Sequence, residues 1–451
     1  MTDAMPHNER TLTLLSDLID RAKTHGADAA DAILVESRAL SFTYRLGRQE
    51  QIERSEASDV GLRVFIGKRQ AIASSSDLTP AALDELAERA TAMARVVPED
   101  PYCGLADPDM LATDVSDVDS CEAGEPSMEA LLERAAATEE AALAVTGVTN
   151  SEGASASWAL SRAAIVTSTG FAKTRARSQH SLSISVLAGE GTQMERDYDY
   201  TAATFAEDLR DPSEVGRTAA ERAVRRLHPR KAGSAQVPVI YDPRAARSLV
   251  SHLGSAVNGA AVARGTTFLK EKLGQTVFPE TITIVDDPLR RRGLRSRAFD
   301  GEGVATRRIA IIDRGVLTTW VLDLRSARQL GLSTTGHATR GTSAPPSPGT
   351  SNLYIAAGDA TPEALTADVR SGFYVTELIG FGINGVTGDY SRGASGFWIE
   401  NGAISYPVSE VTVAGNLIDM FAHVTAANDL EFRYGTDAPT LRVDGMTVAG
   451  V

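Results

Sequence analysis

His252 lies in the stretch SLVSHLGSAVNGAAVAR (248–264), which follows a strand-like VPVIYD and has the pattern of a helix. A zinc site that hydrolyses peptides from a helix needs two imidazoles on one helix face and a glutamate beside the first, to take a proton from the bound water. Leu253 follows His252, and Ala256 and Val257 stand four and five positions on, so none of them can bind a metal. The other histidines are far apart, at positions 7, 25, 180, 228, 337 and 423. We therefore expect no local metal site and interpret His252 as a partly buried, hydrogen-bonded side chain; a site gathered from distant histidines stays open.

A glycine-rich stretch, GFGING at 380–385, matches the G-x-G-x-x-G pattern of dinucleotide-binding proteins and follows the strand-like FYVTELI. That chemistry needs a helix N-terminus directly after the glycines to hold the pyrophosphate. The residues that follow, VTGDYSRGASG, add three more glycines and do not favour a helix. We interpret the match as accidental.

The stretch GDYSRGASG at 388–396 is expected to be a loop between strands. Its backbone amides, Ser391 and Arg392 could bind a carboxylate or a phosphate. It contains neither the GKS/T run of a phosphate-binding loop nor a G-x-S-x-G elbow, which weakens Ser391 as a nucleophile. The simpler interpretation is a tight turn that uses the conformational freedom of glycine, or a contact with another subunit.

Charge is unevenly distributed along the chain. The net charge of −14 disfavours general binding to nucleic acid or to anionic membranes. Residues 98–125 are acidic and contain no lysine or arginine, which predicts an exposed linker or long loop that repels itself. By contrast, RRRGLRSR at 290–297 places five arginines in eight residues, and RAVRRLHPRK at 222–231 is basic too. Neither run is interleaved with aromatic residues, so we interpret both as solvated or partner-facing patches.

Short alternating apolar runs, separated by a smaller number of helical patterns, predict an α+β protein. The expected parts are an N-terminal α/β domain (1–97), the acidic linker (98–125), a middle α+β domain (126–230) and a strand-rich, barrel- or sandwich-like C-terminal domain with few helices (235–451). In the last domain we expect hairpins at DRG (313–315) and NG (401–402), and helices at about 243–262, 325–330, 362–370 and 415–423. The sequence shows no internal repeat.

We expect a cytoplasmic protein without a membrane segment. The first residues, MTDAMPHNERTLTLLSDLID, contain an acid and no long apolar core, unlike a signal peptide. No stretch approaches the roughly 20 apolar residues that span a bilayer. Two cysteines, Cys103 and Cys121, match no metal or redox motif, and such sparse use suits a reducing compartment.

Two long strings in the C-terminal part carry a resemblance to a known family. They are FDGEGVATRRIAIIDRGVLTTWVLDLRSARQLGLSTTGHA (299–338) and VTELIGFGINGVTGDYSRGASGFWIENGAISYPVSEVTVAGNLIDMF (375–421). Both closely resemble the PmbA branch, also called TldE, of the TldD/PmbA family, the "modulator of DNA gyrase" proteins. A weaker likeness extends to DAILVES and the strands after it, so that the resemblance covers nearly the whole chain.

The resemblance implies a subunit of a heterodimeric peptidase that acts on unfolded peptides. In this family the TldD branch holds a metal with H-E-x-x-x-H on a helix and a later cysteine, and the PmbA branch lacks these ligands. Laid over this chain, the motif places Ser251 and Ala256 at the histidine positions and His252 at the glutamate position, and the stretch after Asp429 offers no cysteine or histidine. The resemblance therefore implies no catalytic and no metal-binding residue here, no cofactor in this chain, and zinc in a TldD-type partner. Contact with the peptide or with that partner is assigned to Gly388, Asp389, Tyr390, Ser391, Arg392 and Gly393.

Two other functions remain as alternatives. The chain could be a metallopeptidase in its own right through a non-local metal site. It could also act on DNA gyrase or nucleic acid, as the older family name and the arginine run at 290–297 suggest; the net charge of −14 argues against this.

Overall fold

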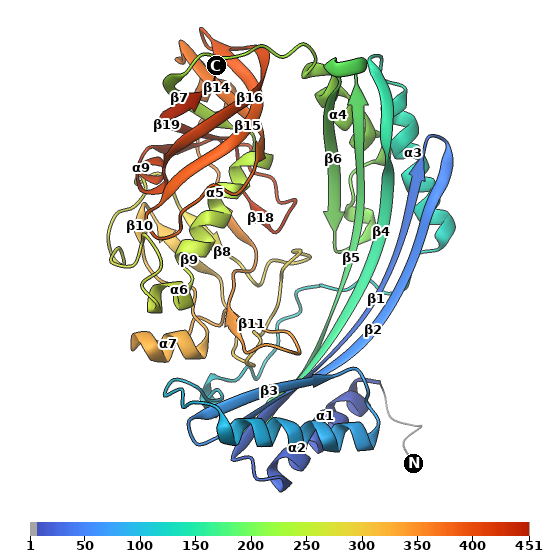
Figure 1. Ribbon diagram of the computed structural model, residues 1–451, viewed down its shortest axis with the longest axis vertical. Coiled ribbons are helices and arrows are strands. Elements are labelled where there is room, and N and C mark those ends of the chain that lie inside the picture. Colours follow the sequence, from blue (N-terminus) through green and yellow to red (C-terminus); the bar gives the residue numbers. More distant parts are fainter. Residues whose placement is uncertain (1–6, 451) are drawn as a thin grey trace.

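The computed structural model describes residues 7–450, and its N-terminal half is built on one long six-stranded sheet in the order β3-β2-β1-β4-β5-β6 (Figure 1). The first unit consists of α1 (His7–Thr24), β1 (Ala29–Arg45), β2 (Arg48–Ile66), β3 (Arg69–Ser75) and α2 (Pro80–Val96). The second consists of α3 (Met128–Leu143), β4 (Val148–Thr167), β5 (Ala172–Ala188), β6 (Glu195–Ala203) and α4 (Pro212–Arg225). Strands β1 and β4 pair antiparallel from Asp31 and Thr167 to Tyr44 and Ala154. The regions 1–97 and 126–230, expected as separate domains, thus share a single sheet.

The two units repeat one arrangement. Each has the element order α-β-β-β-α, and their strands are ordered symmetrically about the β1–β4 pair. Both helix pairs cover the same face of the sheet: Ala32 and Leu34 of β1 pack in the core with α1 and α2, and Leu40 and Phe42 of the same strand pack in the core with α3 and α4. This is the geometry of two copies related by a half-turn through the sheet. The two units share this arrangement although the sequence shows no repeat, because an apolar face can be built from many sequences of the same pattern.

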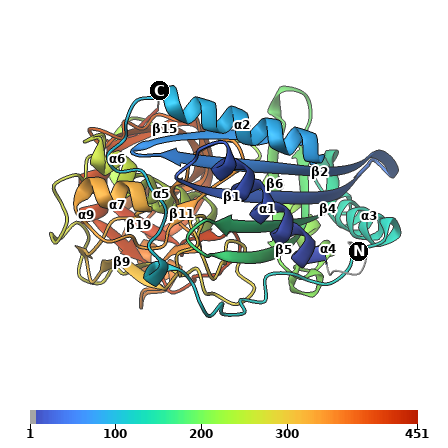
Figure 2. The same cartoon turned by 90° about the horizontal axis from the view of Figure 1, so that it is seen from below.

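The opposite face of the sheet meets the C-terminal unit. Ile33 and Ile165 point away from the helices, as the alternation of side chains along a strand requires, and pack in one cluster with Phe171 and Phe299. Figure 2, seen from below, shows α1 and α2 in front, the C-terminal unit at one side and α3 at the other. The C-terminal unit is therefore held against the sheet as a second layer.

The C-terminal unit is rich in strands and has short helices. Its elements are β7 (Ala235–Tyr241), α5 (Pro243–Ala256), α6 (Gly259–Ala263), β8 (Ile284–Asp286), β9 (Ile309–Asp313), β10 (Val316–Leu317), α7 (Leu324–Leu330), β11 (Ala338–Thr339), β12 (Ser347–Pro348), β13 (Leu353–Ile355), α8 (Pro362–Thr366), β14 (Ser371–Ile379), β15 (Asp389–Glu400), β16 (Ala403–Asn416), α9 (Leu417–Ala422), β17 (Val424–Ala426), β18 (Thr436–Asp437) and β19 (Leu441–Ala449). Strands β16-β15-β14-β7-β19 close into a barrel through the β16–β19 pairing, and β10-β9-β8-β13-β18 form a second sheet. The expected strand-rich, barrel-like unit with few helices is confirmed.

Both hairpin predictions are confirmed. Arg314 and Gly315 connect β9 to β10, and Asn401 and Gly402 connect β15 to β16, all four with positive φ. Two consecutive positive φ values are what a two-residue turn of this kind requires, and asparagine and glycine tolerate them best.

The acidic segment 98–125 is largely irregular and partly exposed, as expected of a linker or long loop, but it packs against the fold at several points. Cys103, Ala106 and Ala112 are buried. Several of its acids pair with basic side chains from elsewhere in the fold, for example Asp100 with Arg325 at 2.6 Å. These ion pairs reduce the self-repulsion that the sequence pattern alone implied.

Part of the arginine run 290–297 supplies the same kind of partner. Arg292 pairs with Asp119 at 2.8 Å and with Glu207 at 2.7 Å, and Arg291 also pairs with Asp119. Arg292 thus neutralises acids of the same chain, whereas the side chain of Arg291 stays largely exposed, as a solvated patch predicts.

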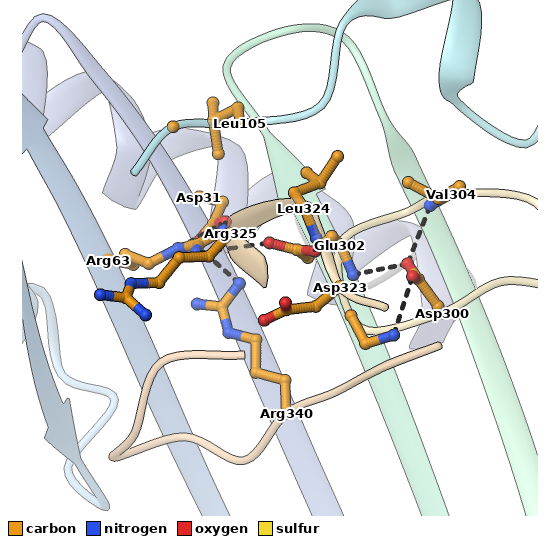
Figure 3. Close-up of polar contacts among 12 residues, drawn as sticks. Asp31, Arg63, Leu105, Asp300, Glu302, Val304, Asp323, Leu324, Arg325 and Arg340 are labelled. Atoms are coloured by element: carbon orange, nitrogen blue, oxygen red, sulfur yellow. Dashed lines mark hydrogen bonds and ion pairs between the residues drawn. The ribbon is translucent and has the colours of Figure 1, made fainter. Parts of the chain in front are cut away.

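A buried ionic cluster links the first unit to the C-terminal unit (Figure 3). Arg63 of β2 donates to Asp31 of β1 at 2.5 Å and lies 3.7 Å from Glu302, and Arg340 pairs with Asp31 at 2.7 Å. Burial would raise the pKa of Asp31, but Arg340 and Arg63 hold it below its usual value. Burial raises the pKa of Glu302 to about 8, helped by nearby Asp300 and opposed by Arg63.

Within residues 7–450 no helix is long and apolar enough to cross a bilayer.

Candidate functional site

Helix α5 carries the positions where a metal-binding motif was sought. It begins after Asp242, whose side chain accepts a hydrogen bond from the backbone N–H of Arg244 at 2.9 Å, and Pro243 takes the first helical position. Leu249, Val250 and Leu253 face the core between the barrel and the second sheet. The opposite helix face is left to face the middle unit.

The three motif positions lie in different surroundings. Ser251 is exposed, and its hydroxyl donates to the carbonyl of Arg247 at 3.1 Å. Ala256 is buried in the core. His252 is partly buried, as expected, but its Nε2 atom is buried with no hydrogen-bond partner among the described residues, so the predicted hydrogen bond was wrong for that atom. Burial and, secondly, the charge of Arg392 lower the pKa of His252 to about 4.

These positions do not fit a zinc ion. A catalytic zinc takes three protein ligands, whereas α5 offers one imidazole beside a guanidinium, a hydroxyl bonded to its own helix and a buried methyl group. Elsewhere in residues 7–450, no three His, Cys, Asp or Glu side chains gather so as to hold a metal. No step of hydrolysis can be derived through a metal on the described residues.

The stretch 388–396 is not a loop. Residues Asp389–Glu400 form β15, which pairs with β14 on one side and β16 on the other. A Cβ at Gly396 would stand 1.9 Å from the carbonyl oxygen of Tyr374, so this glycine allows two strands to approach and makes no turn. Tyr390 is 1% exposed, so its side chain is not available as a peptide or subunit contact.

The connection between β14 and β15 is the preceding segment, 380–388. It contains GFGING and leads into a strand, whereas a dinucleotide site needs a helix after the glycines, so the match is accidental as interpreted. We call this segment with its flanking Ile379 the hairpin tip. Three of its apolar side chains project into solvent: Ile379 is 59% exposed, Phe381 95% and Val386 55%.

Ser251 and Arg392, which sequence reasoning singled out separately, line the same cleft of about 420 Å³. This α5 cleft lies between the middle unit and the C-terminal unit. Arg247, Ser248 and Ser251 come from α5, Glu377 and Arg392 from β14 and β15, and Tyr198, Arg295 and Tyr434 complete much of the wall. In Figure 1, β6, which carries Tyr198, is the strand of the long sheet nearest to the C-terminal unit.

A network of buried charges holds the two sides of the α5 cleft together. Arg244 of α5 donates to Asp197 of β6 at 2.8 Å and to the carbonyl of Tyr198 at 2.9 Å. Arg226, at the end of α4, donates to Glu377 of β14 at 2.5 Å and to Asp197 at 3.4 Å. Burial would raise the pKa of Asp197, but Arg244 and then Arg226 hold it below its usual value.

Three other guanidinium groups in the cleft, those of Arg247, Arg295 and Arg392, have no carboxylate partner among residues 7–450. Arg247 lies over the ring of Tyr434, at 4.6 Å from its centroid, and forms no ion pair. The Nε atom of Arg392 is buried and finds no hydrogen-bond partner in the described part of the chain. A guanidinium pairs best with a carboxylate or phosphate, so the cleft is suited to bind an anionic group.

Sequence reasoning missed Asp197, Tyr198, Arg226, Arg244 and Arg247. One signal was present: the strand ERDYDYTAA alternates aspartate with tyrosine, and both aspartates, 197 and 199, are buried. Carboxylates on a buried strand face require cationic partners, which the sequence could not locate.

Comparison with known proteins covers most of the chain. Residues 30–94, 121–227 and 234–450 match the three parts of one family description: PmbA/TldA metallopeptidase domain 1, central domain and C-terminal domain. Metalloprotease PmbA of Escherichia coli O157:H7 is 39% identical over 94% of this chain and 93% of that protein. The chain belongs to the PmbA/TldD metallopeptidase family. A second relative of this PmbA/TldD chain, the Metalloprotease PmbA homolog of Haemophilus influenzae, is 36% identical over 97% of this chain and 95% of that protein.

Solved structures share the fold of this PmbA/TldD chain. A protein of Bacteroides thetaiotaomicron, described as a candidate modulator of DNA gyrase, superposes with a TM-score of 0.90 at 28% identity over 99% of this chain and all of that one. TldE of Thermococcus kodakarensis superposes with a TM-score of 0.86 at 21% identity over 97% of this chain and all of that one, which shows the common fold.

Proposed function

We propose that this chain is the non-catalytic, TldE-type subunit of a two-chain cytoplasmic peptidase, which binds an unfolded peptide that a zinc-containing, TldD-type subunit hydrolyses. The observation that carries the proposal is the state of α5. Its three motif positions supply a single imidazole with a lowered pKa, while the same helix lines a cleft that fits an anionic group. A helix that offers too few metal ligands for a zinc ion but still borders a cleft suits binding without hydrolysis.

The α5 cleft supports recognition of an extended peptide. Arg247 and Arg392 would bind its terminal carboxylate or an acidic side chain. Strand β6 lies at the end of its sheet and pairs only with β5, so one edge carries backbone groups without strand partners. An extended chain can add to such an edge through its own backbone, which makes recognition depend little on sequence.

The hairpin tip supports contact with the second subunit. Phe381 stands almost free of this chain. Covering a phenylalanine side chain contributes about 1.5–3 kcal/mol, which makes it a suitable anchor in an interface. We therefore move the proposed subunit contact from residues 388–393, which lead into and form part of strand β15, to the tip that precedes them.

Reconstitution tests the proposal directly. This chain, a TldD-type chain from the same genome and their mixture would be assayed with an unstructured fluorogenic peptide, and the metal content of each would be measured. We expect cleavage by the mixture, no cleavage by this chain alone and no stoichiometric zinc in it. Chelator-sensitive cleavage by this chain alone would establish instead that it is a metallopeptidase in its own right.

The wording "modulator of DNA gyrase" in the description of the Bacteroides protein suggests a second function, an effect on gyrase or DNA. Arg291 and Arg292 of the most basic run already pair with acids of this chain, and the net charge is −14. Salt-dependent DNA binding by the isolated chain would favour that function over ours.

A further inference from the structure

A second cavity, of about 680 Å³, lies between the C-terminal unit and the sheet face that the helices leave uncovered. Residues of the segment 115–120 form part of its wall. Five guanidinium groups from three separate parts of the chain line it: Arg175 and Arg177 of β5, Arg295 and Arg297 of the 290–297 run, and Arg340. We call it the arginine cavity. This concentration of positive charge is unexpected inside a chain of net charge −14.

Four of these arginines meet only neutral oxygen atoms. Arg175 donates to the carbonyl of Phe299 at 3.3 Å, and Arg177 to that of Leu294 at 2.9 Å. Arg297 donates from Nη2 to the carbonyl of Gly349 at 2.8 Å.

The remaining contacts of this group are no stronger. The Nε atom of Arg297 is buried with no partner among the described residues. Arg295 donates to the hydroxyl of Thr436 at 3.3 Å. Within residues 7–450, none of Arg175, Arg177, Arg295 and Arg297 forms an ion pair with a carboxylate, and the fifth arginine, Arg340, pairs with Asp31 of the buried ionic cluster.

The nearest carboxylates are already engaged elsewhere. Asp300 accepts hydrogen bonds from the backbone N–H groups of Glu302, Val304 and Ala338. Asp286 accepts from the backbone and the hydroxyl of Ser351 and is hydrogen-bonded to His337. Asp117, in the cavity wall, accepts from the backbone N–H of Asp119. The positive charge of the cavity is therefore not cancelled by direct pairing.

This arrangement opposes folding when the cavity holds no anion. Burial, together with repulsion from Arg297 and Arg177, lowers the pKa of Arg175 to about 10. Burial and nearby Arg295 lower the pKa of Arg177, and burial lowers the pKa of Arg297 even though Asp300 and Asp286 oppose this shift. Charges in such surroundings are usually paired or bind a counter-ion.

We propose that the arginine cavity binds a small organic anion carrying two or more phosphate or carboxylate groups. The planar guanidinium group matches both anions with paired hydrogen bonds, and several groups converging on one space favour multiple charge over single charge. The volume lies within the range of about 300–1,000 Å³ that is usual for small-molecule sites. Ile33, Val35 and Phe299 form an apolar part of the wall that would hold the uncharged portion of the ligand. This binding goes beyond the proposed subunit function and does not depend on it.

Calorimetric titration of the full chain with pyrophosphate and, separately, with citrate at low ionic strength tests the proposal. We expect one saturable site, weakened by added NaCl, and a rise in the thermal unfolding temperature on binding. Binding of pyrophosphate alone would assign phosphate chemistry, and binding of citrate alone would assign carboxylate chemistry.

The variants Arg175→Gln and Arg297→Gln should each weaken binding about tenfold or more, since each loses one charge-assisted contact. Their thermal unfolding temperature without ligand should hold or rise, because one repelling charge is gone. Arg314→Gln, at the exposed β9–β10 turn outside the cavity, is the matched control and should bind as the wild type does. If neither probe binds with a Kd of about 1 mM or lower, the proposal is wrong; a Kd of 1 mM corresponds to a binding free energy of about −4 kcal/mol. It is equally wrong if the two cavity variants bind as tightly as the control.

Discussion

The carboxylate of Asp197 on β6 accepts a hydrogen bond at 2.8 Å from Nη1 of Arg244, the second residue of α5. Both side chains are buried. This pair joins the middle sheet to the helix that lines the α5 cleft, so the shape of the cleft depends on an ion pair between two units. Removing one partner of a buried pair leaves the other charge without compensation.

Asp197→Asn should therefore lower the free energy of unfolding by about 3–5 kcal/mol, because Arg244 and Arg226 lose a shared buried partner. Asp20→Asn is the control: Asp20 is exposed and pairs only with Lys23 on the same helix, so a change within about 0.5 kcal/mol is expected. Urea denaturation of both variants measures the difference. Equal effects would show that the Asp197 pair does not stabilise the fold as we describe.

The buried ionic cluster predicts a pH dependence of stability. Folding raises the pKa of Glu302 from 4.5 to about 8, so the folded chain binds this proton more tightly than the unfolded chain does. The contribution of Glu302 to stability is then full below about pH 4.5 and is lost as the pH rises towards 8. Glu302→Gln keeps an acceptor for the N–H of Leu324 but does not titrate. Its free energy of unfolding should therefore fall by about 2–3 kcal/mol less than that of the wild type as the pH rises. Unfolding curves of wild type and variant that stay parallel from pH 5 to pH 9 would contradict this assignment.

His252 predicts the opposite slope at lower pH. Its pKa falls from 6.5 to about 4 on folding, so protonation favours the unfolded chain. Stability should decrease as the pH falls from 6.5 to 4, by about 1–2 kcal/mol relative to His252→Gln once solvent screening is allowed for. NMR titration of the imidazole measures the pKa itself. A value near 6.5 would show that the ring is solvated and not confined beside Arg392.

Arg392→Gln tests peptide binding in the α5 cleft. We expect a rise in KM of about tenfold for the reconstituted pair with kcat unchanged, because a contact to an anionic group of the peptide is lost before any chemistry. The same variant should raise the pKa of His252, since the charge of Arg392 helps to lower it. Arg308→Gln, exposed and away from the cleft, is the control and should change neither quantity. Unchanged KM in the Arg392 variant would remove this residue from the proposed site.

Phe381→Ser tests the subunit contact at the hairpin tip. Binding to a TldD-type chain should weaken by about 2 kcal/mol or more if this side chain anchors the interface, while the unfolding temperature of the isolated chain stays the same. Val96→Ser is matched to it, because Val96 is the last residue of α2 in the first unit and is 82% exposed and apolar. Sedimentation of the mixed subunits gives the affinity. If both variants lose assembly, or neither does, the hairpin tip is not part of the subunit interface.

Local patterns in the sequence were sufficient for the elements whose causes are local. The start of α5 follows from Asp242 and Pro243, and the β15–β16 turn from Asn401 and Gly402, because capping and positive φ depend only on adjacent residues. That Ser251 and Ala256 offer no imidazole could also be read directly, because residue identity needs no structure. The family and the strand-rich C-terminal unit were also recognisable from local sequence patterns.

The tertiary structure decided everything that depends on which distant segments meet. The glycines of 388–396 predicted a loop, whereas Gly396 lies in a strand against the carbonyl of Tyr374. The acids of 98–125 predicted a free linker, whereas some of them, such as Asp100, pair with distant basic side chains. The α5 cleft brings together Tyr198, Arg247 and Arg392, and the arginine cavity draws on β5, the 290–297 run and Arg340. The spacing of residues along the chain does not predict these contacts. The free energy of burying a charge, or of pairing two strand edges, depends on which distant residues lie beside that charge or edge.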